Sequence, residues 1–276
     1  MNVSMITNTV KESIIKINYH LNDTLVSKIR EAKDKETNLT AISILEDLLE
    51  NQAIAKKGDV PLCQDTGVAV IFLEVGSEVV FDGDIYEAIQ QGVREGYHDG
   101  YLRKSIVSHP FKRTNTLDNT PAIIHTTIVP GTSVRLKIAS KGGGSENMSK
   151  VVMLTPAEGI EGVKKVVLDT IFHAGGKPCP PIIVGIGLGG NLEKSALLAK
   201  EALFRDLDDE NQDPIIAQLE RDLYHEINTL GVGPMGVGGE TTCLAVKINY
   251  TAMHIASLPV AINIQCHSAR HTEVVL

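Results

Sequence analysis

The sequence contains no tryptophan, and aromatic residues make up only 4% of its 276 residues. Such a chain offers few aromatic faces on which nucleic-acid bases stack. Basic residues are not in excess either, because the formal net charge is -8, which disfavours a nucleic-acid or anionic-membrane surface. We therefore expect neither nucleic acid nor membrane as a partner.

The sequence also lacks long apolar segments. No run of 18 or more apolar residues occurs, so we expect no helix that crosses a membrane. The N-terminal stretch MNVSMITNTVKESIIKIN has no apolar core of the kind found in signal peptides, and its pattern is that of an amphipathic helix. These features predict a cytoplasmic protein.

Cysteine is scarce, and the four residues Cys63, Cys179, Cys243 and Cys266 are widely separated. In a protein expected in the cytoplasm, such cysteines act as metal ligands, reactive thiols or core residues more often than as disulfide partners. Their spacing matches neither a zinc knuckle nor a ferredoxin run, so spacing alone does not select among these roles.

The apolar pattern divides the chain into two regions. Residues 1–57 have apolar side chains at helical spacing and are predicted to be mainly helical. Residues 58–276 mix strands and helices without the strict alternation of a doubly wound sheet, so we predict a single α+β domain over residues 1–276. The predicted strands are 68–75, 123–129, 133–139, 182–186, 241–250 and 259–265, and the predicted helices after residue 58 are 84–100, 156–173, 192–204 and 215–230.

The stretch KPCPPIIVGIGLGG, residues 177–190, combines a cysteine, two prolines and several glycines. Pro180 and Pro181 have no backbone N–H and a fixed φ, so Cys179 is expected at a stiff corner outside any strand ladder. The β-branched residues that follow predict a strand buried on both faces. The glycines after it predict a turn, with Asn191 as the N-cap of the next helix. Such a corner holds a thiolate at a fixed angle.

Three of the cysteines share one context. Cys63 and Cys179 each precede a predicted strand, and Cys266 directly follows one, so each thiolate is able to project into a cleft. Cys243 instead lies in the stretch TTCLAV and is expected to be a buried small hydrophobe. Closed zinc sites and electron-transfer clusters use four protein ligands. Three thiolates on a [4Fe–4S] cluster leave one iron open, as a Lewis-acid site requires.

Several polar residues near these cysteines are candidates for handling a substrate. Asp65 has two interpretations, a group that protonates a substrate hydroxyl and the acceptor of an Asx turn. Arg103 and Arg270 are each either a carboxylate clamp or a solvated cation. His254 lies in the mostly apolar stretch YTAMHIASLPV, where a buried core histidine is the alternative to an active-site residue. The glycines 142–144 bring backbone N–H groups to a carboxylate or form a plain mobile loop.

Four separated motifs indicate a known family. CQDTG at 63–67, KGGGSEN at 141–147, KPCPPIIVGIGLGG at 177–190 and INIQCHSARH at 262–271 resemble the iron–sulfur (class I) fumarate hydratases and L-tartrate dehydratases. The resemblance runs from about residue 10 to the end of the sequence, with the motifs in the same order. It implies a hydro-lyase that acts on a small dicarboxylate. Reversible hydration of fumarate to malate is the first expectation, and L-tartrate dehydration is the alternative.

The resemblance also implies roles for individual residues. It implies a [4Fe–4S] cluster in a cleft, held by Cys63, Cys179 and Cys266, with its fourth iron open to the substrate. Cys243 matches no ligand position. The other matching positions are the catalytic residues Asp65 and His254 and the substrate contacts Gln64, Arg103, Gly143 and Gly144.

The end of the sequence differs from the single-chain members of that family. Those members continue past the last cluster cysteine into a further domain, whereas this sequence ends ten residues after Cys266. It therefore resembles the alpha subunit of the two-subunit form. The resemblance implies a hetero-oligomer in which a beta subunit supplies the base that removes the carbon-bound proton.

Two other functions remain open at this point. An electron-transfer or sensing iron–sulfur protein would need a fourth ligand, for which Cys243 is the candidate. A nucleotide-binding module is suggested by the glycine-rich stretch at 185–190, although its spacing is not GxGxxG and no Walker lysine follows it.

Overall fold

The computed structural model describes residues 1–58 and 60–276, so the predicted mixed region 58–276 is described except at residue 59. The chain divides into two compact units: unit 1 comprises Met1–Leu21, Asn51–Gly143 and Arg270–Leu276, and unit 2 comprises Asn22–Glu50 and Gly144–Ala269. Each unit has a four-stranded sheet and helices, which confirms the predicted α+β class. Both units are built from separate segments of the chain, so this division does not test the expectation of one domain over residues 1–276, which stays a prediction.

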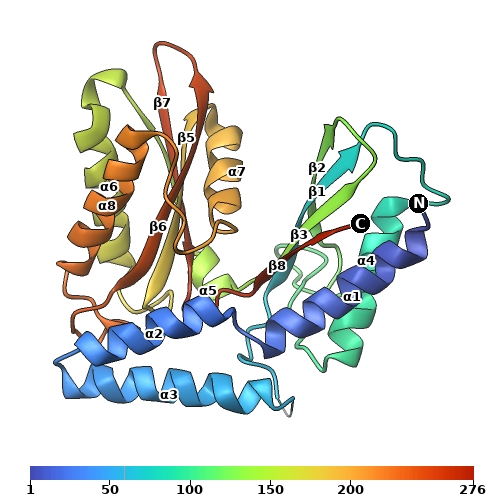
Figure 1. Ribbon diagram of the computed structural model, residues 1–276, viewed down its shortest axis with the longest axis horizontal. Coiled ribbons are helices and arrows are strands. Elements are labelled where there is room, and N and C mark those ends of the chain that lie inside the picture. The colour runs from blue at the N-terminus through green and yellow to red at the C-terminus, as the bar shows by residue number, and fades with distance from the viewer. Residues whose placement is uncertain (59) are drawn as a thin grey trace. The chain divides into compact units, whose positions relative to one another are not determined.

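Unit 1 combines one sheet with helices. Its elements are α1 (Val3–Tyr19), β1 (Val68–Gly76), α4 (Ile85–Asp99), β2 (Ile123–Val129), β3 (Val134–Lys141) and β8 (His271–Val275). The strands have the order β2-β1-β3-β8, and only the pair β1 and β2 is parallel (Figure 1). The helix α1 packs against α4 and β3 through the buried residues Ile6, Val10 and Ile14, whose spacing is helical. The core of unit 1 lies between these helices and the sheet.

Unit 2 has a sheet with helices on both faces. Its strands are β4 (Lys150–Leu154), β5 (Ile182–Gly190), β6 (Cys243–Met253) and β7 (Leu258–Gln265), and its helices include α2 (Asp23–Lys35), α6 (Gly159–Ala174), α7 (Leu192–Ala202) and α8 (Pro214–Asn228). The strand order is β4-β7-β5-β6, so β6 is an edge strand. Figure 1 shows α7 on one face of this sheet and α6 and α8 on the other.

Short elements and two boundary helices complete the chain. The boundary between the units falls within α3 (Leu39–Lys56) and at the start of α5 (Gly143–Glu146), and the short 3-10 helices are Pro156–Glu158 and Pro234–Gly236. The predicted helical character of residues 1–57 is confirmed by α1, α2 and α3. In the part of the chain that is described, no helix is both long and apolar enough to cross a membrane.

The strand β5 is longer than predicted, because it continues through the glycines that were expected to form a turn. A Cβ atom on Gly187 would lie 1.9 Å from the carbonyl oxygen of Ser195, and one on Gly185 would lie 2.2 Å from that of Ala199. Both carbonyls belong to α7. The glycines therefore allow the backbone of α7 to approach the strand. Asn191 is the N-cap of α7, as predicted, and its side chain accepts from the N–H of Lys194 at 3.1 Å.

Candidate functional site

Cys179 lies at the predicted corner, between the end of α6 and the start of β5. It is exposed, and its φ of +56° lies in the left-handed region that residues other than glycine seldom adopt. Its backbone N–H donates to the carbonyl of Gly176 at 3.1 Å and not to a strand. Unusual backbone conformations of this kind cluster at functional sites.

Cys266 lies beside Cys179 in unit 2. It follows the last residue of β7, Gln265, which pairs with Ile183 near the start of the antiparallel strand β5. The next residue, His267, contacts the carbonyl oxygen of Cys179 with its backbone N–H at 3.4 Å and its ring Nδ1 at 3.0 Å. The two cysteines are therefore held at the same end of the sheet.

Cys63 belongs to a polar turn of unit 1 in which Asp65 is the central acceptor. One carboxylate oxygen of Asp65 accepts from the N–H of Gly67 at 3.1 Å, which is the Asx turn predicted as one of its two interpretations. The other oxygen accepts from the N–H of Gly143 at 2.8 Å. Asp65 thus connects the motif 63–67 to the motif 141–147, while Gln64 is exposed at the surface of the same turn.

Arg103 lies next to this turn. Its carbonyl oxygen accepts from the hydroxyl of Thr66 at 2.7 Å, and its guanidinium Nη2 is 3.7 Å from a carboxylate oxygen of Asp65. About half of the side chain is exposed (53%), so its donors are accessible to a ligand. The backbone of Arg103 is therefore fixed by the turn, and its guanidinium also donates to the hydroxyl of Ser105 at 3.3 Å.

Tyr97 and Asn119 hold the turn through its backbone carbonyls. Neither residue was identified from the sequence. The hydroxyl of Tyr97 donates to the carbonyl of Thr66 at 2.7 Å and contacts that of Gly67 at 3.1 Å, and burial raises the pKa of Tyr97 to about 12. Asn119 donates to the carbonyl of Gly67 at 3.1 Å and accepts from the N–H of Ser105 at 2.7 Å.

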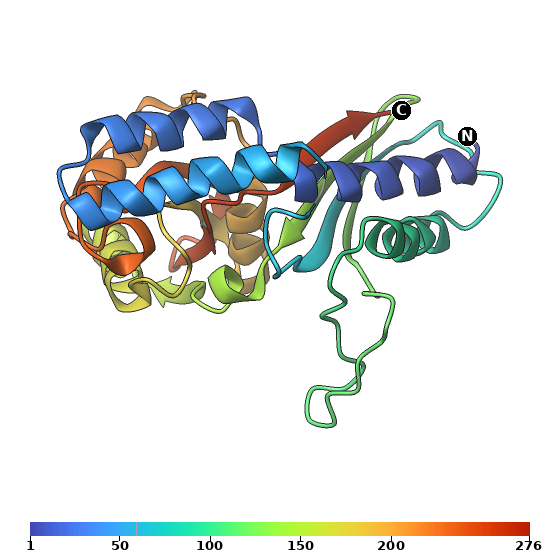
Figure 2. The same ribbon diagram turned by 90° about the horizontal axis from the view of Figure 1, so that it is seen from below.

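These contacts fix both ends of the segment between α4 and β2. Figure 2 shows this segment, which carries Arg103, as a long loop that extends away from the sheet and helices of unit 1. Only the base of the loop is tied to the turn, through Arg103 at one end and Asn119 at the other.

The glycine motif approaches the turn closely. A Cβ atom on Gly67, whose φ is +70°, would lie 2.4 Å from the carbonyl oxygen of Lys141. Gly142 and Gly143 have no positive φ, so glycine is not required there by the backbone conformation. The absence of a side chain instead allows the backbone to approach Asp65 closely. The N–H of Gly143 is already bonded to Asp65, and Gly144, with which the second segment of unit 2 begins, is exposed.

His254 does not lie near the cysteine pair of unit 2. It is exposed in the turn between β6 and β7, where its ring accepts from the N–H of Ala256 at 3.1 Å. The alternative interpretation as a buried core histidine is therefore wrong. The eight-residue strand β7 separates it from Cys266, and at ~3.3 Å per residue this is roughly 26 Å.

Cys243 is the one cysteine of the four that is fully buried. It begins β6, its thiol donates to the carbonyl of Ala245 at 3.1 Å, and burial raises its pKa to about 12. The prediction of a buried small hydrophobe is confirmed. The thiol lies inside the core and is directed at a backbone carbonyl, so it is not accessible as a fourth ligand for an electron-transfer cluster.

The donor set fits a thiolate-bound metal in part. None of the cysteines forms a disulfide. Cys179 and Cys266 present neighbouring, accessible thiols, the ligand type that iron–sulfur clusters use. Within residues 1–58 and 60–276 no group of three His, Cys, Asp or Glu side chains forms a metal site, and Cys63 belongs to the other unit. The pair in unit 2 is therefore the part of the ligand set that the geometry supports.

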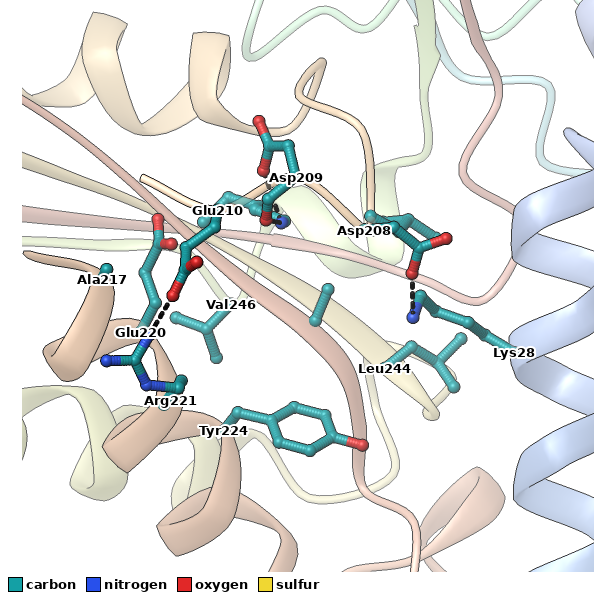
Figure 3. Close-up of a pocket in the computed structure, with 13 residues that line it drawn as sticks. Lys28, Asp208, Asp209, Glu210, Ala217, Glu220, Arg221, Tyr224, Leu244 and Val246 are labelled. Atoms are coloured by element: carbon teal, nitrogen blue, oxygen red, sulfur yellow. Dashed lines mark hydrogen bonds and ion pairs between the residues drawn. The ribbon is translucent and has the colours of Figure 1, made fainter. Parts of the chain in front are cut away.

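A separate cavity of about 460 Å³ lies beside the edge strand β6, between α2, α8 and the segment 207–210 (Figure 3). Its charged side chains already neutralise one another, because Lys28 pairs with Asp208 and Arg221 pairs with Glu210. No unpaired buried donor is directed into it, among the residues described. This cavity is therefore a weaker candidate than the cysteine end of the sheet.

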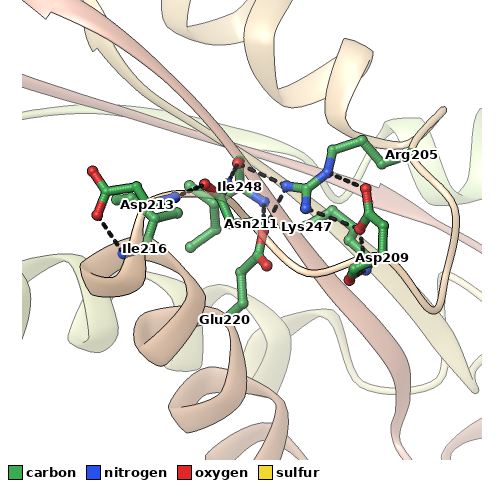
Figure 4. A network of polar contacts seen from close by, with 8 residues as sticks. All are labelled: Arg205, Asp209, Asn211, Asp213, Ile216, Glu220, Lys247 and Ile248. Carbon is green, nitrogen blue, oxygen red and sulfur yellow. Dashed lines mark hydrogen bonds and ion pairs between the residues drawn. The ribbon is translucent and has the colours of Figure 1, made fainter.

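Three residues that line this cavity, Asp209, Glu220 and Lys247, belong to a polar network that covers the outer edge of β6 (Figure 4). Arg205 binds both carboxylate oxygens of Asp209 at 2.9 Å and donates to Glu220 at 2.7 Å. Glu220 accepts from the N–H of Ile248 at 2.6 Å, while Arg205 donates to the carbonyl of the same residue at 2.9 Å. These side chains satisfy backbone groups that an edge strand otherwise exposes.

Comparisons with known proteins agree with the motifs. The family model described as fumarate hydratase (Fumerase) matches residues 7–275. A protein of Methanocaldococcus jannaschii named "Putative L(+)-tartrate dehydratase subunit alpha" is 42% identical, over 96% of this chain and 95% of its own length. The L(+)-tartrate dehydratase subunit alpha of Escherichia coli K12 is 30% identical, over 97% of this chain and 89% of its own length.

Proposed function

The chain belongs to the fumarate hydratase family of hydro-lyases, and on that premise we propose that it is the alpha subunit of a two-subunit enzyme that dehydrates L(+)-tartrate. The names of its relatives support tartrate, which the sequence motifs gave as the alternative, over the first expectation of fumarate and malate. The observation that carries the proposal is the pairing of Cys179 and Cys266 at one end of a sheet, through the contacts of His267 with Cys179.

In this proposal Cys63, Cys179 and Cys266 hold a [4Fe–4S] cluster, which when bound supplies a Lewis-acid centre with one open position. The cluster requires three deprotonated thiols. The thiol of Cys243 is outside the set because it is fully buried in the core of unit 2 and donates to the carbonyl of Ala245. An electron-transfer cluster with four cysteine ligands is disfavoured for the same reason.

The remaining residues of the proposal bind and orient a dicarboxylate. Arg103 offers its half-exposed guanidinium to one carboxylate. Asp65, held by Gly67 and Gly143, assists proton transfer at the leaving hydroxyl, and Gln64 and the backbone at Gly143 and Gly144 line the site. A beta subunit removes the proton from the neighbouring carbon. Cysteines that form no disulfide support the cytoplasm as its location.

His254 is too far from the cysteine pair of its own chain to act on a substrate bound there. A small dicarboxylate at the cysteine end of unit 2 does not reach along the length of β7 to the turn that carries His254. We therefore assign the catalytic role of His254 to the site of a second alpha chain in the assembled enzyme.

The central experiment is anaerobic co-expression of the chain with its proposed beta subunit. The complex is assayed with L(+)-tartrate, L-malate, fumarate and mesaconate, with the chain alone as the control. We expect dehydration of L(+)-tartrate by the complex and no turnover by the chain alone. Preferential conversion of malate and fumarate would restore the first expectation, and no turnover of any dicarboxylate by the iron-loaded complex would overturn the hydro-lyase assignment.

The clamp is tested by Arg103→Ala in the same complex. Loss of a charged hydrogen bond costs about 1.5–3 kcal/mol, so kcat/KM is expected to fall by roughly tenfold or more. The matched control is Arg113→Ala, which removes an exposed arginine from the same loop. An unchanged kcat/KM in Arg103→Ala would contradict the clamp.

A further inference from the structure

Arg270 is among the largest fully buried side chains in the described residues, with 2% of its surface exposed. It lies between Cys266 and β8, and its carbonyl accepts from the N–H of Ser140 in β3 at 3.0 Å. The sequence left open whether it is a carboxylate clamp or a solvated cation. Its burial excludes the solvated cation.

Asn18 in α1 fixes the guanidinium from one side. Its side-chain oxygen accepts from Nη1 of Arg270 at 3.1 Å. The amide nitrogen of Asn18 donates to the carbonyl of Ile14 at 2.8 Å and to the hydroxyl of Ser140 at 2.9 Å. Because the carbonyl of Ile14 can only accept and the guanidinium of Arg270 can only donate, the amide nitrogen of Asn18 points to Ile14 and its oxygen points to Arg270.

The other side of the guanidinium faces the turn of the candidate site. Nη2 of Arg270 lies 3.4 Å from the position that a Cβ of Gly142 would take, and a carboxylate oxygen of Asp65 lies 3.2 Å from the same position. Gly142 therefore has the Arg270 cation and the Asp65 carboxylate as its nearest neighbours there. A side chain at residue 142 would crowd both of them.

No carboxylate lies within ion-pair distance of Arg270 in the described residues, although that of Asp65 is close by. Arg270 forms no ion pair there, and its Nε has no hydrogen-bond partner. A buried cation is normally paired, and a buried donor is normally satisfied. An arginine with an orphaned donor beside a substrate-binding turn is explained if an anion completes its environment.

We propose that Arg270 is a positioning residue of the substrate site, whose buried guanidinium, oriented by Asn18, supports the Asp65–Gly143 turn and supplies positive charge to the dicarboxylate bound there. The inference rests on the proposed function for the identity of the anion. A dianionic substrate on a protein with a net charge of -8 needs such local cations. Arginine suits the role because its planar group bonds to Asn18 on one side while other donors face the turn.

The test uses the co-expressed complex and malonate, an unreactive dicarboxylate, as the probe. Malonate binding is measured by calorimetry and by the shift of the thermal midpoint, alongside iron content. We expect Arg270→Gln to weaken malonate binding by about tenfold or more, the loss that a charged hydrogen bond carries. Arg270→Lys keeps the charge and is expected to retain more of the binding. Iron content should stay at the wild-type level.

Arg135→Gln is the matched control, because it removes one positive charge from an exposed arginine of β3 in the same unit. It should leave malonate binding unchanged. If Arg270→Gln fails to fold, Asn18→Ala replaces it, since this variant keeps the cation but releases its orientation, and weaker malonate binding is again expected. Wild-type malonate binding in the folded variant would overturn the proposal and leave Arg270 a core residue.

The two proposals fail in different ways. A complex that binds malonate through Arg270 but converts no hydroxy acid overturns the hydro-lyase assignment and supports the inference. A complex that dehydrates L(+)-tartrate with an unchanged KM in Arg270→Gln overturns the inference and leaves the proposed function standing.

Discussion

At the scale of single residues, burial separates Cys243 from the three other cysteines. Cys63 and Cys266 are half-buried and Cys179 is exposed, so their thiols are accessible to a metal or a reagent. The thiol of Cys243 donates to a backbone carbonyl inside the core of unit 2. Position relative to a strand, which the sequence reveals, was therefore a sound guide to which thiols are accessible.

We expect Cys243→Ala to retain iron and Cys266→Ala to lose it, when both are produced anaerobically with the beta subunit. Cys243→Ala removes one small core group and should lower the free energy of unfolding by about 1 kcal/mol. Because burial raises the pKa of Cys243 to about 12, this thiol should also resist iodoacetamide at pH 8 in the folded chain. Iron analysis and mass spectrometry provide the measurements. Loss of iron in Cys243→Ala would favour a four-cysteine cluster instead.

At the scale of secondary structure, the glycine-rich stretch at 185–190 shows what the sequence does not predict. Its composition suggested a turn and, as an alternative, a phosphate-binding loop. Gly185 and Gly187 instead lie inside β5, under the backbone of α7. Local sequence reveals that a close approach occurs, but it does not reveal which element makes the approach. The short strands β4 and β8 were not predicted either, because a stretch of five residues is too short for its pattern to indicate a strand.

The same limit applies to the candidate site. The cysteine motifs, Asp65 and Arg103 were identified from their sequence context. Tyr97 and Asn119 were not, since each acts through a contact with the turn at 66–67 that lies far away in the sequence. Hydrophobic periodicity carries no information about such contacts.

Gly187→Ala should destabilise unit 2, because the new methyl group would lie 1.9 Å from the carbonyl oxygen of Ser195. Overpacking of this kind costs about 3 kcal/mol. The control is Gly231→Ala, at an exposed position with open space and a φ of +68°, where only the backbone conformation costs about 1 kcal/mol. Urea denaturation of both variants gives the comparison. Equal losses would show that α7 moves away from β5 at little cost.

The network at the edge of β6 predicts a pH dependence. Burial alone raises the pKa of Asp209, but the hydrogen bonds from Arg205 and Lys247 outweigh it, so the pKa lies below its usual range. A carboxylate with a lowered pKa in the folded state stabilises the protein above the unfolded value of about 3.9, and this contribution is lost as the pH falls through the folded value.

Asp209→Asn should therefore lower the urea midpoint at pH 7 by an amount that stays constant down to about pH 5 and shrinks below about pH 4. Asp206→Asn, which changes an exposed carboxylate three residues earlier, is the control and should show no such trend. A difference between Asp209→Asn and the wild type that grows as the solution is acidified would contradict the assignment.

At the scale of the whole molecule, the position of His254 bears on whether this residue acts in the site of its own chain or in the site of a second alpha chain. Cys179 and Cys266 lie at one end of the unit 2 sheet, and His254 lies in the turn at the other end. Met253 and Ile255 on either side of it are exposed, at 46% and 90%. In the proposed mechanism, His254 therefore acts in a site whose cysteine pair belongs to a different chain.

Co-expression of two alpha variants with the beta subunit tests this arrangement by complementation. His254→Asn and Cys179→Ala should each be inactive alone, but a mixed assembly combines the intact cysteines of one chain with the intact histidine of the other. For random pairing in a two-fold symmetric arrangement, roughly a quarter of the wild-type activity should return. The pair Cys179→Ala with Cys266→Ala is the control, because both changes damage the same end of the same sheet, and it should stay inactive. If the first pair also stays inactive while His254→Asn alone abolishes turnover, His254 acts within its own chain; if His254→Asn is fully active, it has no catalytic role.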